Sequence, residues 1–213
     1  MLNRGATIIL HLGDVYYAGF PEEFKKISDK IKQLRTKVPK LRYYTIPGNH
    51  DFYTNGGPFY ASLNDYNDKQ EHIQHFGFFC LRNKSNTVQY IGLDTGFSDS
   101  GTFDEIDMKF EGAYVYPEEL AWAKEKILTF PGQTILLIHH QAFSPYDKIL
   151  GSLTSFGASN QFINPKLCEQ LFEILPKVSV WYWGHEHRLN LFKPNAYGIP
   201  CSRTLGNSAF QIH

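Results

Sequence analysis

The stretch Tyr43-Tyr44-Thr45-Ile46-Pro47-Gly48-Asn49-His50-Asp51 joins a short apolar run to a cluster of polar side chains. Aromatic and β-branched residues at Tyr43–Ile46 favour a strand, and Pro47-Gly48 ends it. Burying Asn49, His50 and Asp51 directly after a strand is costly unless each side chain finds a partner. The stretch therefore predicts a strand with a polar site at its carboxyl end.

The same arrangement of apolar run and polar cluster recurs three more times. The pairs are Thr7–Leu12 with Gly13-Asp14, Thr134–Ile138 with His139-His140, and Val178–Trp183 with Gly184-His185-Glu186-His187. Taken singly, each cluster also fits a turn or a hydrogen-bonded strand end. In open α/β sheets, ligands bind at the carboxyl ends of the strands. Four such clusters in one chain therefore predict one shared site, and we interpret it as a metal site.

The rest of the chain alternates apolar runs with helical patterns, which predicts a layered α/β architecture. Helices are expected at Pro21–Lys37, with an apolar face of Phe24, Ile27, Ile31 and Leu34, and from Pro117 to about Leu128. Further strands are expected at Phe78–Leu81, Thr87–Leu93, Leu189–Phe192, Ser202–Leu205 and Ala209–Ile212. The polar insertion Asp94–Tyr116 contains the acidic stretch Asp99–Glu111, which fits either a lid or a solvated loop. Without a repeat or linker, residues 1–213 are expected to form a single domain.

The residue types in the clusters suit metal ions. His185 and His187 are two residues apart, so their rings can flank two ions, and the Asp14 carboxylate can bridge two cations. Asn49 offers an amide oxygen and His139 a further imidazole. Mixed His, Asp and Asn ligands favour Zn, Fe, Mn or Ni over a thiolate zinc site.

The order GD, GNHD, HH, GHEH resembles the calcineurin-like metallophosphoesterase superfamily, and the resemblance covers the chain from Ile8 to its end. It implies a four-layered α/β/β/α sandwich and a binuclear metal site. There a bridging hydroxide would hydrolyse phosphate mono- or diesters. By this resemblance Asp14 bridges both metals, Asn49, His139 and His185 bind one ion, and His187 binds the other.

Three neighbouring side chains receive other roles from the same resemblance. His50 is expected to stabilise or protonate the leaving oxygen. Asp51 could orient His50 without binding metal. His140 is expected to be structural or to support the ligands, since the family's ligand is usually the first polar residue after the strand.

The first motif also separates subgroups of the superfamily. Asp14 is followed at the third position by Tyr17, and G-D-x-x-Y looks like the purple acid phosphatases, where the tyrosine oxygen binds ferric iron. The alternative interpretation of Tyr17 is an aromatic packing residue beside Tyr16. The resemblance thus implies Fe, Mn or Zn as two divalent or mixed-valence ions, in a chain close to purple acid phosphatase-like bacterial enzymes.

One motif of the superfamily is missing. A D-x-H or D-x-G strand should precede GD, and neither motif occurs before Gly13. We therefore expect a chain that lacks its first β-α unit, leaving a gap with an unpaired edge in the sheet. Two functions follow as alternatives: a phosphoesterase, or a truncated, non-catalytic remnant that binds metal or phosphate, with only one ion if the first site is lost.

Composition adds limits on partners and location. Lys and Arg total 21, as do Asp and Glu, and the pI is about 7.1, so the basic excess of a nucleic-acid binder is absent. No apolar run reaches the roughly 18 residues of a membrane span. We expect a cytoplasmic protein acting on a small phosphate ester, without nucleic-acid or membrane partners. Cys80, Cys168 and Cys201 have no paired spacing, which argues against a disulfide framework.

Overall fold

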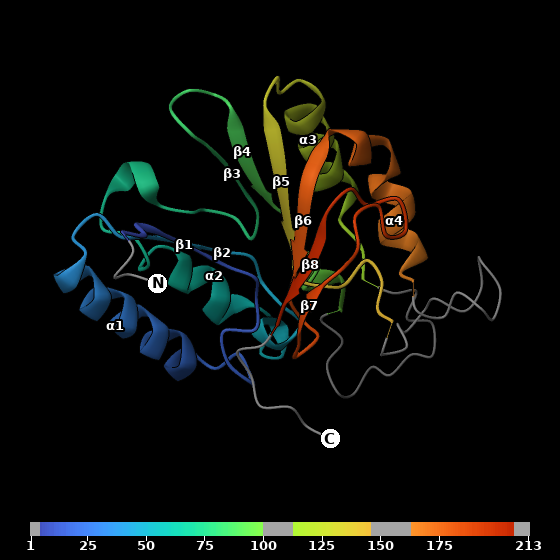
Figure 1. The fold of residues 1–213 in the computed structure, drawn as a ribbon. Helices are drawn as coiled ribbons and strands as arrows, with labels where there is room; N and C mark the ends of the chain where they lie inside the picture. Colours follow the sequence, from blue (N-terminus) through green and yellow to red (C-terminus); the bar gives the residue numbers. More distant parts are fainter. Residues whose placement is uncertain (1–4, 100–112, 146–162, 207–213) are drawn as a thin grey trace.

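The computed structural model describes residues 5–99, 113–145 and 163–206, and these residues form two β-sheets (Figure 1). The smaller sheet pairs β1 (Ile8–His11) with β2 (Arg42–Thr45) in parallel. The larger sheet has the order β3-β4-β5-β6-β8-β7. Its strands are β3 (Phe79–Arg82), β4 (Val88–Gly92), β5 (Gln133–Ile138), β6 (Val178–Trp183), β7 (Leu189–Leu191) and β8 (Ser202–Leu205). Strands β4, β5, β6 and β8 are parallel, and β3 and β7 are antiparallel edges.

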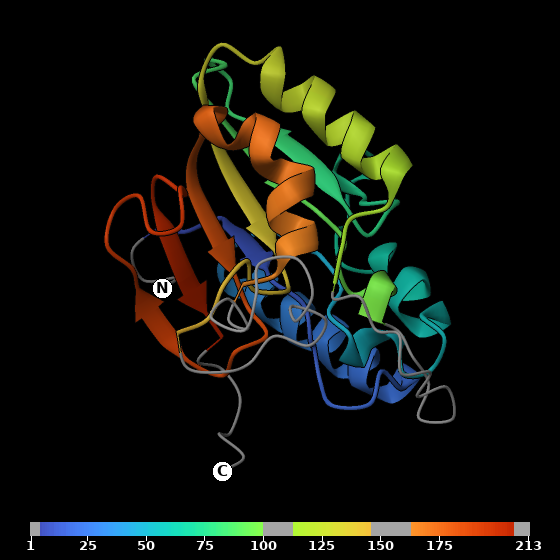
Figure 2. The same cartoon turned by 90° about the vertical axis from the view of Figure 1, so that its right-hand side faces the viewer.

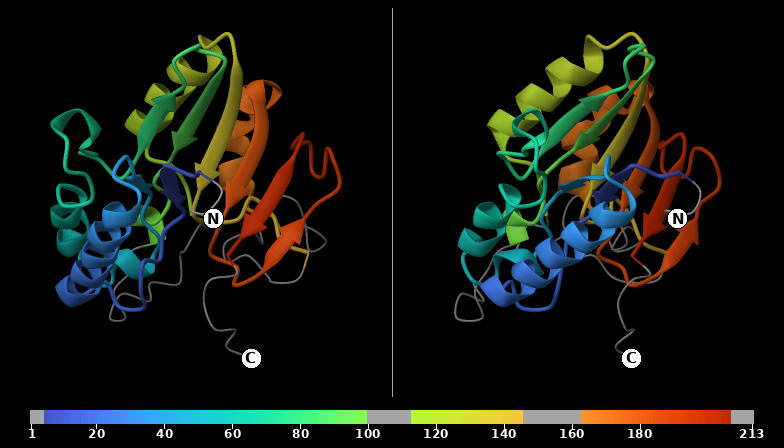
Figure 3. Two further views of the ribbon diagram at one scale, coloured as in Figure 1. Left: turned by 60° about the vertical axis from the view of Figure 1, so that its left-hand side comes forward. Right: turned by 90° about the vertical axis from the view of Figure 1, so that its left-hand side faces the viewer.

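The two sheets pack face to face, and helices cover both outer faces (Figures 1 and 3). Tyr44, Ile46 and Leu137 fill the space between the sheets. Helices α1 (Pro21–Lys37) and α2 (Gly57–Leu63) cover the smaller sheet. Helices α3 (Pro117–Leu128) and α4 (Pro165–Leu171) cover the larger one, as Figure 2 shows. The predicted α/β/β/α sandwich is confirmed.

Helix α1 begins and ends where the sequence predicts. Pro21 occupies the first turn, where its missing N–H costs nothing. Glu23 Oε2 accepts hydrogen bonds from the backbone N–H groups of Ala18 (3.2 Å) and Phe20 (2.9 Å) just before the helix. Phe24 and Ile31 of the predicted apolar face are fully buried. Helix α3 also has its predicted bounds, whereas α2 and α4 were not predicted.

Short 3₁₀ turns complete the described helices: η2 (His50–Phe52), η3 (Gln70–His72), η4 (Phe97–Asp99) and η6 (Phe172–Lys177). The predicted strand Ala209–Ile212 and most of the acidic stretch lie outside the described residues. Among the helices of the described part, none has the length and apolar character needed to cross a membrane.

Strand β1 belongs to the smaller sheet. In the described part of the chain it pairs with β2 alone. A cleft of about 490 Å³ lies alongside β1 over the face of the larger sheet, with Tyr90, Ile135 and Tyr182 among its lining residues. One end of this cleft reaches the polar clusters.

Candidate metal centre

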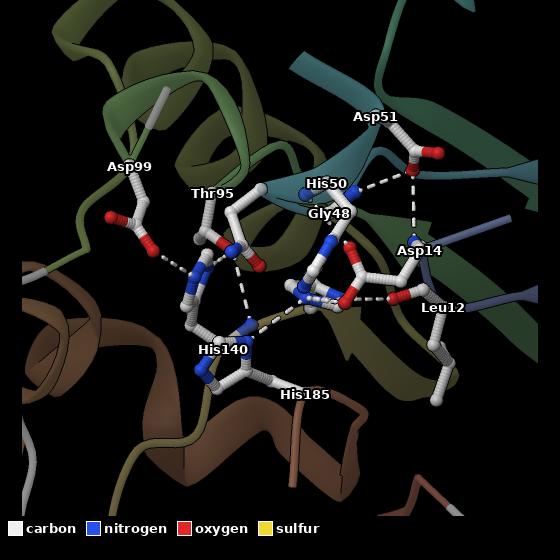
Figure 4. Close-up of polar contacts among 12 residues, drawn as sticks. Leu12, Asp14, Gly48, His50, Asp51, Thr95, Asp99, His140 and His185 are labelled. Carbon is white, nitrogen blue, oxygen red and sulfur yellow. Dashed lines mark hydrogen bonds and ion pairs between the residues drawn. The ribbon is translucent and has the colours of Figure 1, made fainter. Parts of the chain in front are cut away.

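The four polar clusters follow β1, β2, β5 and β6, and the structure brings them together (Figure 4). Since β1 is parallel to β2 and β5 to β6, their carboxyl ends lie on shared edges. His139 Nε2 lies 3.2 Å from Asp14 Oδ2 and 3.2 Å from His185 Nδ1. These atoms come from segments far apart in the sequence. The predicted convergence is therefore observed for Asp14, His139 and His185.

The tautomer of His139 follows from its surroundings. Its Nδ1 lies 2.6 Å from the Leu12 carbonyl oxygen, an acceptor, so the Nδ1–H donates to it. Its Nε2 faces Asp14 and His185. Burial lowers the pKa of His139, but Asp14 outweighs it and raises that pKa, so metal binding would have to displace the Nε2 proton before the lone pair could ligate. Histidines that bind metal usually donate a hydrogen bond from one ring N–H to a carbonyl and bind the ion through the other ring nitrogen.

Asn49 provides a direct test of whether a cation fits. Its side chain is 7% exposed, and its Nδ2 donates to the Tyr53 hydroxyl at 3.0 Å. Its Oδ1 is buried and has no hydrogen-bond partner in the described structure. An unpaired buried acceptor is costly, and a cation ligated by this oxygen would remove that cost. The donor set therefore fits a metal ion.

Glycines make this close approach feasible. Gly13 has φ of +96°, and a Cβ there would lie 2.5 Å from Gly48 N and 2.6 Å from His139 Nδ1. A Cβ on Gly48 would collide with the Asp14 carboxylate. Both glycines are thus required to bring the loops after β1 and β2 against His139.

Asp51 supports the backbone of the site. Its carboxylate accepts hydrogen bonds from the N–H groups of Asp14 (2.9 Å), Val15 (3.0 Å) and Gly48 (2.8 Å). That Asp51 orients His50 stays a prediction. A buried carboxylate beside backbone donors binds them, and here it ties the loops after β1 and β2 together.

His50 is oriented by the backbone of Tyr17. His50 Nδ1 lies 2.6 Å from the Tyr17 carbonyl oxygen, and the ring lies between those of Tyr17 (4.9 Å between centroids) and Tyr53 (4.6 Å). The His50 backbone N–H donates to Asp14 Oδ1 at 3.1 Å. With Nδ1 donating to the carbonyl, Nε2 is the nitrogen left for chemistry.

Tyr17, predicted as a ligand, lies at the rim. Its side chain is 65% exposed, and its ring packs on His50. Among the described residues, no hydrogen bond joins the Tyr17 hydroxyl to Asp14 or His187. Metal ligation by the Tyr17 oxygen stays a prediction.

His187 and Glu186 complete the last cluster. His187 is half-buried and lines the same cleft as Asp14, His139 and His185. Glu186 is buried, and its carboxylate accepts hydrogen bonds from Ser144 and from Thr204, the latter at 3.4 Å. No sequence pattern predicts these contacts of Glu186, since an acidic residue between two histidines is equally compatible with a solvated turn.

Charge in the site is arranged for a cation. Burial would raise the pKa of Asp14, but His139 outweighs it and holds that pKa well below its usual range. Burial, together with the charge of Asp14, raises the pKa of Asp51 to about 7. Burial lowers the pKa of His185 well below its ordinary value, and the neighbouring His140 and His139 lower it further. A neutral His185 beside an ionised Asp14 has the protonation states that metal ligation requires.

A family model of calcineurin-like phosphoesterases matches residues 2–189. The chain therefore belongs to the calcineurin-like phosphoesterase family, as its motifs predicted. A comparison with curated proteins found no match. Membership implies metal-dependent phosphoesterase activity in general and the binding of divalent metals, in line with the histidine cluster of His139, His140 and His185.

Proposed function

We propose that this protein hydrolyses small phosphate mono- or diesters at a binuclear metal site formed by the clusters after β1, β2, β5 and β6. Two observations carry the proposal: Asn49 Oδ1, in the loop after β2, is buried without a partner in the described structure, and atoms of Asp14, His139 and His185 converge. Polar atoms so arranged have unmet bonding capacity that a cation would fill. Family membership supplies the reaction class.

Each side chain receives a defined role. Asn49, His139 and His185 would hold one ion together with Asp14. Asp14 and His187 would hold the other, with Fe, Mn or Zn as the candidate metals. Bound divalent ions would supply a water of lowered pKa and neutralise charge on the phosphate. The chain's own contribution is to fix these ligands, through the Leu12 carbonyl behind His139 and the three backbone N–H groups on the Asp51 carboxylate.

His50 is proposed to act on the leaving group. Its Nδ1–H donates to the Tyr17 carbonyl at 2.6 Å, so His50 would act as the imidazolium, whose Nε2–H donates a hydrogen bond or the proton to the departing oxygen and leaves the neutral Nδ1–H ring. General acid help is typically worth about 10² to 10⁴ in rate. An alkoxide leaving group needs this help more than a phenolate, because the alkoxide is the stronger base.

The purple acid phosphatase-like assignment is a finer proposal with its own test. If the Tyr17 oxygen binds ferric iron, the iron-loaded protein should show visible charge-transfer absorption that Tyr17→Phe removes. Absorption unchanged by Tyr17→Phe would support its packing role beside His50 instead.

A second candidate function is metal or phosphate binding without turnover. On the proposed assignment, four side chains would hold one ion, Asp14, Asn49, His139 and His185, but only Asp14 and His187 would hold the other. Asp14, His139, His185 and His187 line one cleft, which supports this division. A chain holding only the first ion would lack half of the charge needed to stabilise the transition state.

Hydrolysis assays with p-nitrophenyl phosphate and bis-p-nitrophenyl phosphate, in Mn²⁺ and then with excess EDTA, separate the two functions. The proposal predicts EDTA-sensitive turnover of at least one ester and its loss in Asp14→Asn. His50→Ala should reduce turnover of alkyl phosphates more than of aryl phosphates. Equal losses on both would remove His50 from the acid role. Metal binding without turnover of either ester would favour the binding function.

A further inference from the structure

His140 lies directly after His139, yet both of its ring nitrogens are already engaged. Its Nε2 lies 3.0 Å from Asp99 Oδ2, and its Nδ1 lies 3.0 Å from Thr95 Oγ1. The His140 backbone N–H also donates to Thr95 Oγ1, at 3.2 Å. Because this oxygen already accepts a hydrogen bond, its own hydrogen can donate to Nδ1, and Nε2–H donates to the Asp99 carboxylate. Neither nitrogen then offers a lone pair to a cation.

The His140 ring nevertheless lies against both candidate ligands. Its centroid is 4.6 Å from that of His185, with the planes tilted by 40°, and 4.8 Å from that of His139, edge to face. Figure 4 shows the His140 ring with Asp99 and Thr95 on one side and His185 on the other. His140 is 5% exposed, so its position is fixed by packing as well as by hydrogen bonds.

His185 depends on this packing more than His139 does. His139 Nδ1 is held by the Leu12 carbonyl. For His185 the only ring hydrogen bond within the described residues is the one between Nδ1 and His139 Nε2, the atoms that face each other in the site. Its backbone has a positive φ of 58°, which places the ring without locking its rotation. Two rings contact His185: that of His139 at 5.2 Å between centroids, edge to face, and that of His140, which lies closer at 4.6 Å. Of these two rings only that of His140 lies outside the proposed ligand set, so it is the contact that can orient His185 without binding the ion.

We propose that Thr95, His140 and Asp99 form a positioning unit for the metal centre. The two outer residues lock the His140 ring, and the locked ring holds His185 in its ligating orientation without binding the ion. This inference rests on the proposed function for the assignment of His139 and His185 as ligands. Both outer residues come from the loop after β4, so the unit also ties that loop to the site.

Zinc binding to purified variants provides the first test, with Zn²⁺ alone as the probe. We expect His140→Phe and Asp99→Ala to keep the ion count of the wild type and to bind Zn²⁺ about 10- to 100-fold more weakly, the usual effect of losing a residue that supports a ligand. Asp99→Asn keeps an oxygen acceptor for Nε2–H and should stay within about threefold of wild type. The double variant of His140→Phe and Asp99→Ala should bind Zn²⁺ no more weakly than His140→Phe alone, because both changes disrupt the same unit.

Two outcomes of this experiment would overturn the proposal. A loss of one ion per chain in His140→Phe would make His140 a ligand. Wild-type affinity in Asp99→Ala would show that the Asp99 contact positions nothing. Because the readout is affinity, a protein that binds zinc but hydrolyses no ester would refute the proposed function and leave this inference standing.

Nitrogen NMR of histidine-labelled protein tests the same unit without requiring metal. We expect the His140 ring to be the neutral Nε2–H tautomer in the wild type. In Asp99→Ala we expect that single tautomer to be lost. On addition of Zn²⁺, nitrogens of His139 and His185 should shift while those of His140 change little. An Nδ1–H tautomer, or a large His140 shift with zinc, would contradict the proposal.

Discussion

Glu119→Gln tests the energetics of a carboxyl pair that lies beside the candidate site. Glu119 is 8% exposed on α3, and its Oε1 accepts the backbone N–H of Asp94 at 2.7 Å. Burial, followed by the charge of Asp94, raises the pKa of Glu119 from 4.5 to about 9. Asp94 begins the loop that carries Thr95 and Asp99, so the pair anchors the proposed positioning unit.

The sign of the pH dependence follows from that raised pKa. Between pH 4.5 and 9 the folded protein holds a proton on Glu119 that the unfolded chain has released, so stability falls as pH rises through this window. At 1.36 kcal/mol per unit, the loss from pH 4.5 to pH 8 is about 5 kcal/mol. Glutamine does not titrate, and its amide oxygen can accept the same N–H from Asp94.

Urea unfolding in EDTA at pH 5 and pH 8 measures this difference. We expect Glu119→Gln to match the wild type within about 1 kcal/mol at pH 5 and to exceed it by about 5 kcal/mol at pH 8. The control is Glu118→Gln, the same change at the exposed neighbouring residue, which should stay within about 0.5 kcal/mol at both pH values. If the unfolding free energies of Glu119→Gln and wild type differed by the same amount at pH 5 and pH 8, the reasoning would be refuted.

Two further substitutions test the packing of the site and of α1. Gly13→Ala should lower the unfolding free energy by at least about 3 kcal/mol and abolish metal binding. The reason is that the new Cβ would lie 2.5 Å from Gly48 N and 2.6 Å from His139 Nδ1. Gly57→Ala, where a Cβ meets nothing within 4 Å, is the control for thermal unfolding. Arg35→Ala should cost about 3 kcal/mol in urea unfolding, because Arg35 donates to two backbone carbonyls at 2.6 and 3.1 Å. An effect below 1 kcal/mol for either variant would contradict the corresponding argument.

The helices, strands and polar clusters that form the core of the fold could be predicted from the sequence because their patterns are local and repeated. The 3.6-residue spacing of Phe24, Ile27 and Ile31 after Pro21 predicted α1 with its observed bounds. Glycine-led polar clusters after apolar strands predicted which side chains would meet, since parallel strands share an edge. These patterns depend only on neighbours in the chain.

The supporting contacts could not be predicted because they join residues that share no local pattern. The backbone N–H groups that surround the Asp51 carboxylate depend on how the loops after β1 and β2 fold together, which no local pattern shows. Asp99 belongs to an acidic stretch that fits a solvated loop equally well, and only the tertiary structure places it against His140. The burial of Glu119 likewise could not be predicted, because acidic residues in the first turn of a helix are favoured there without being buried.

The central claim is that this chain binds catalytic metal through Asp14, Asn49, His139 and His185. Its most direct test is the number of ions per folded chain after incubation with Mn²⁺ and removal of free metal, compared with Asp14→Asn. We predict bound Mn²⁺ in the wild type, two ions if the binuclear proposal is correct, and loss of binding in the variant. A folded wild-type chain that retains no ion, or an Asp14→Asn variant that binds as many ions as wild type, would contradict the account.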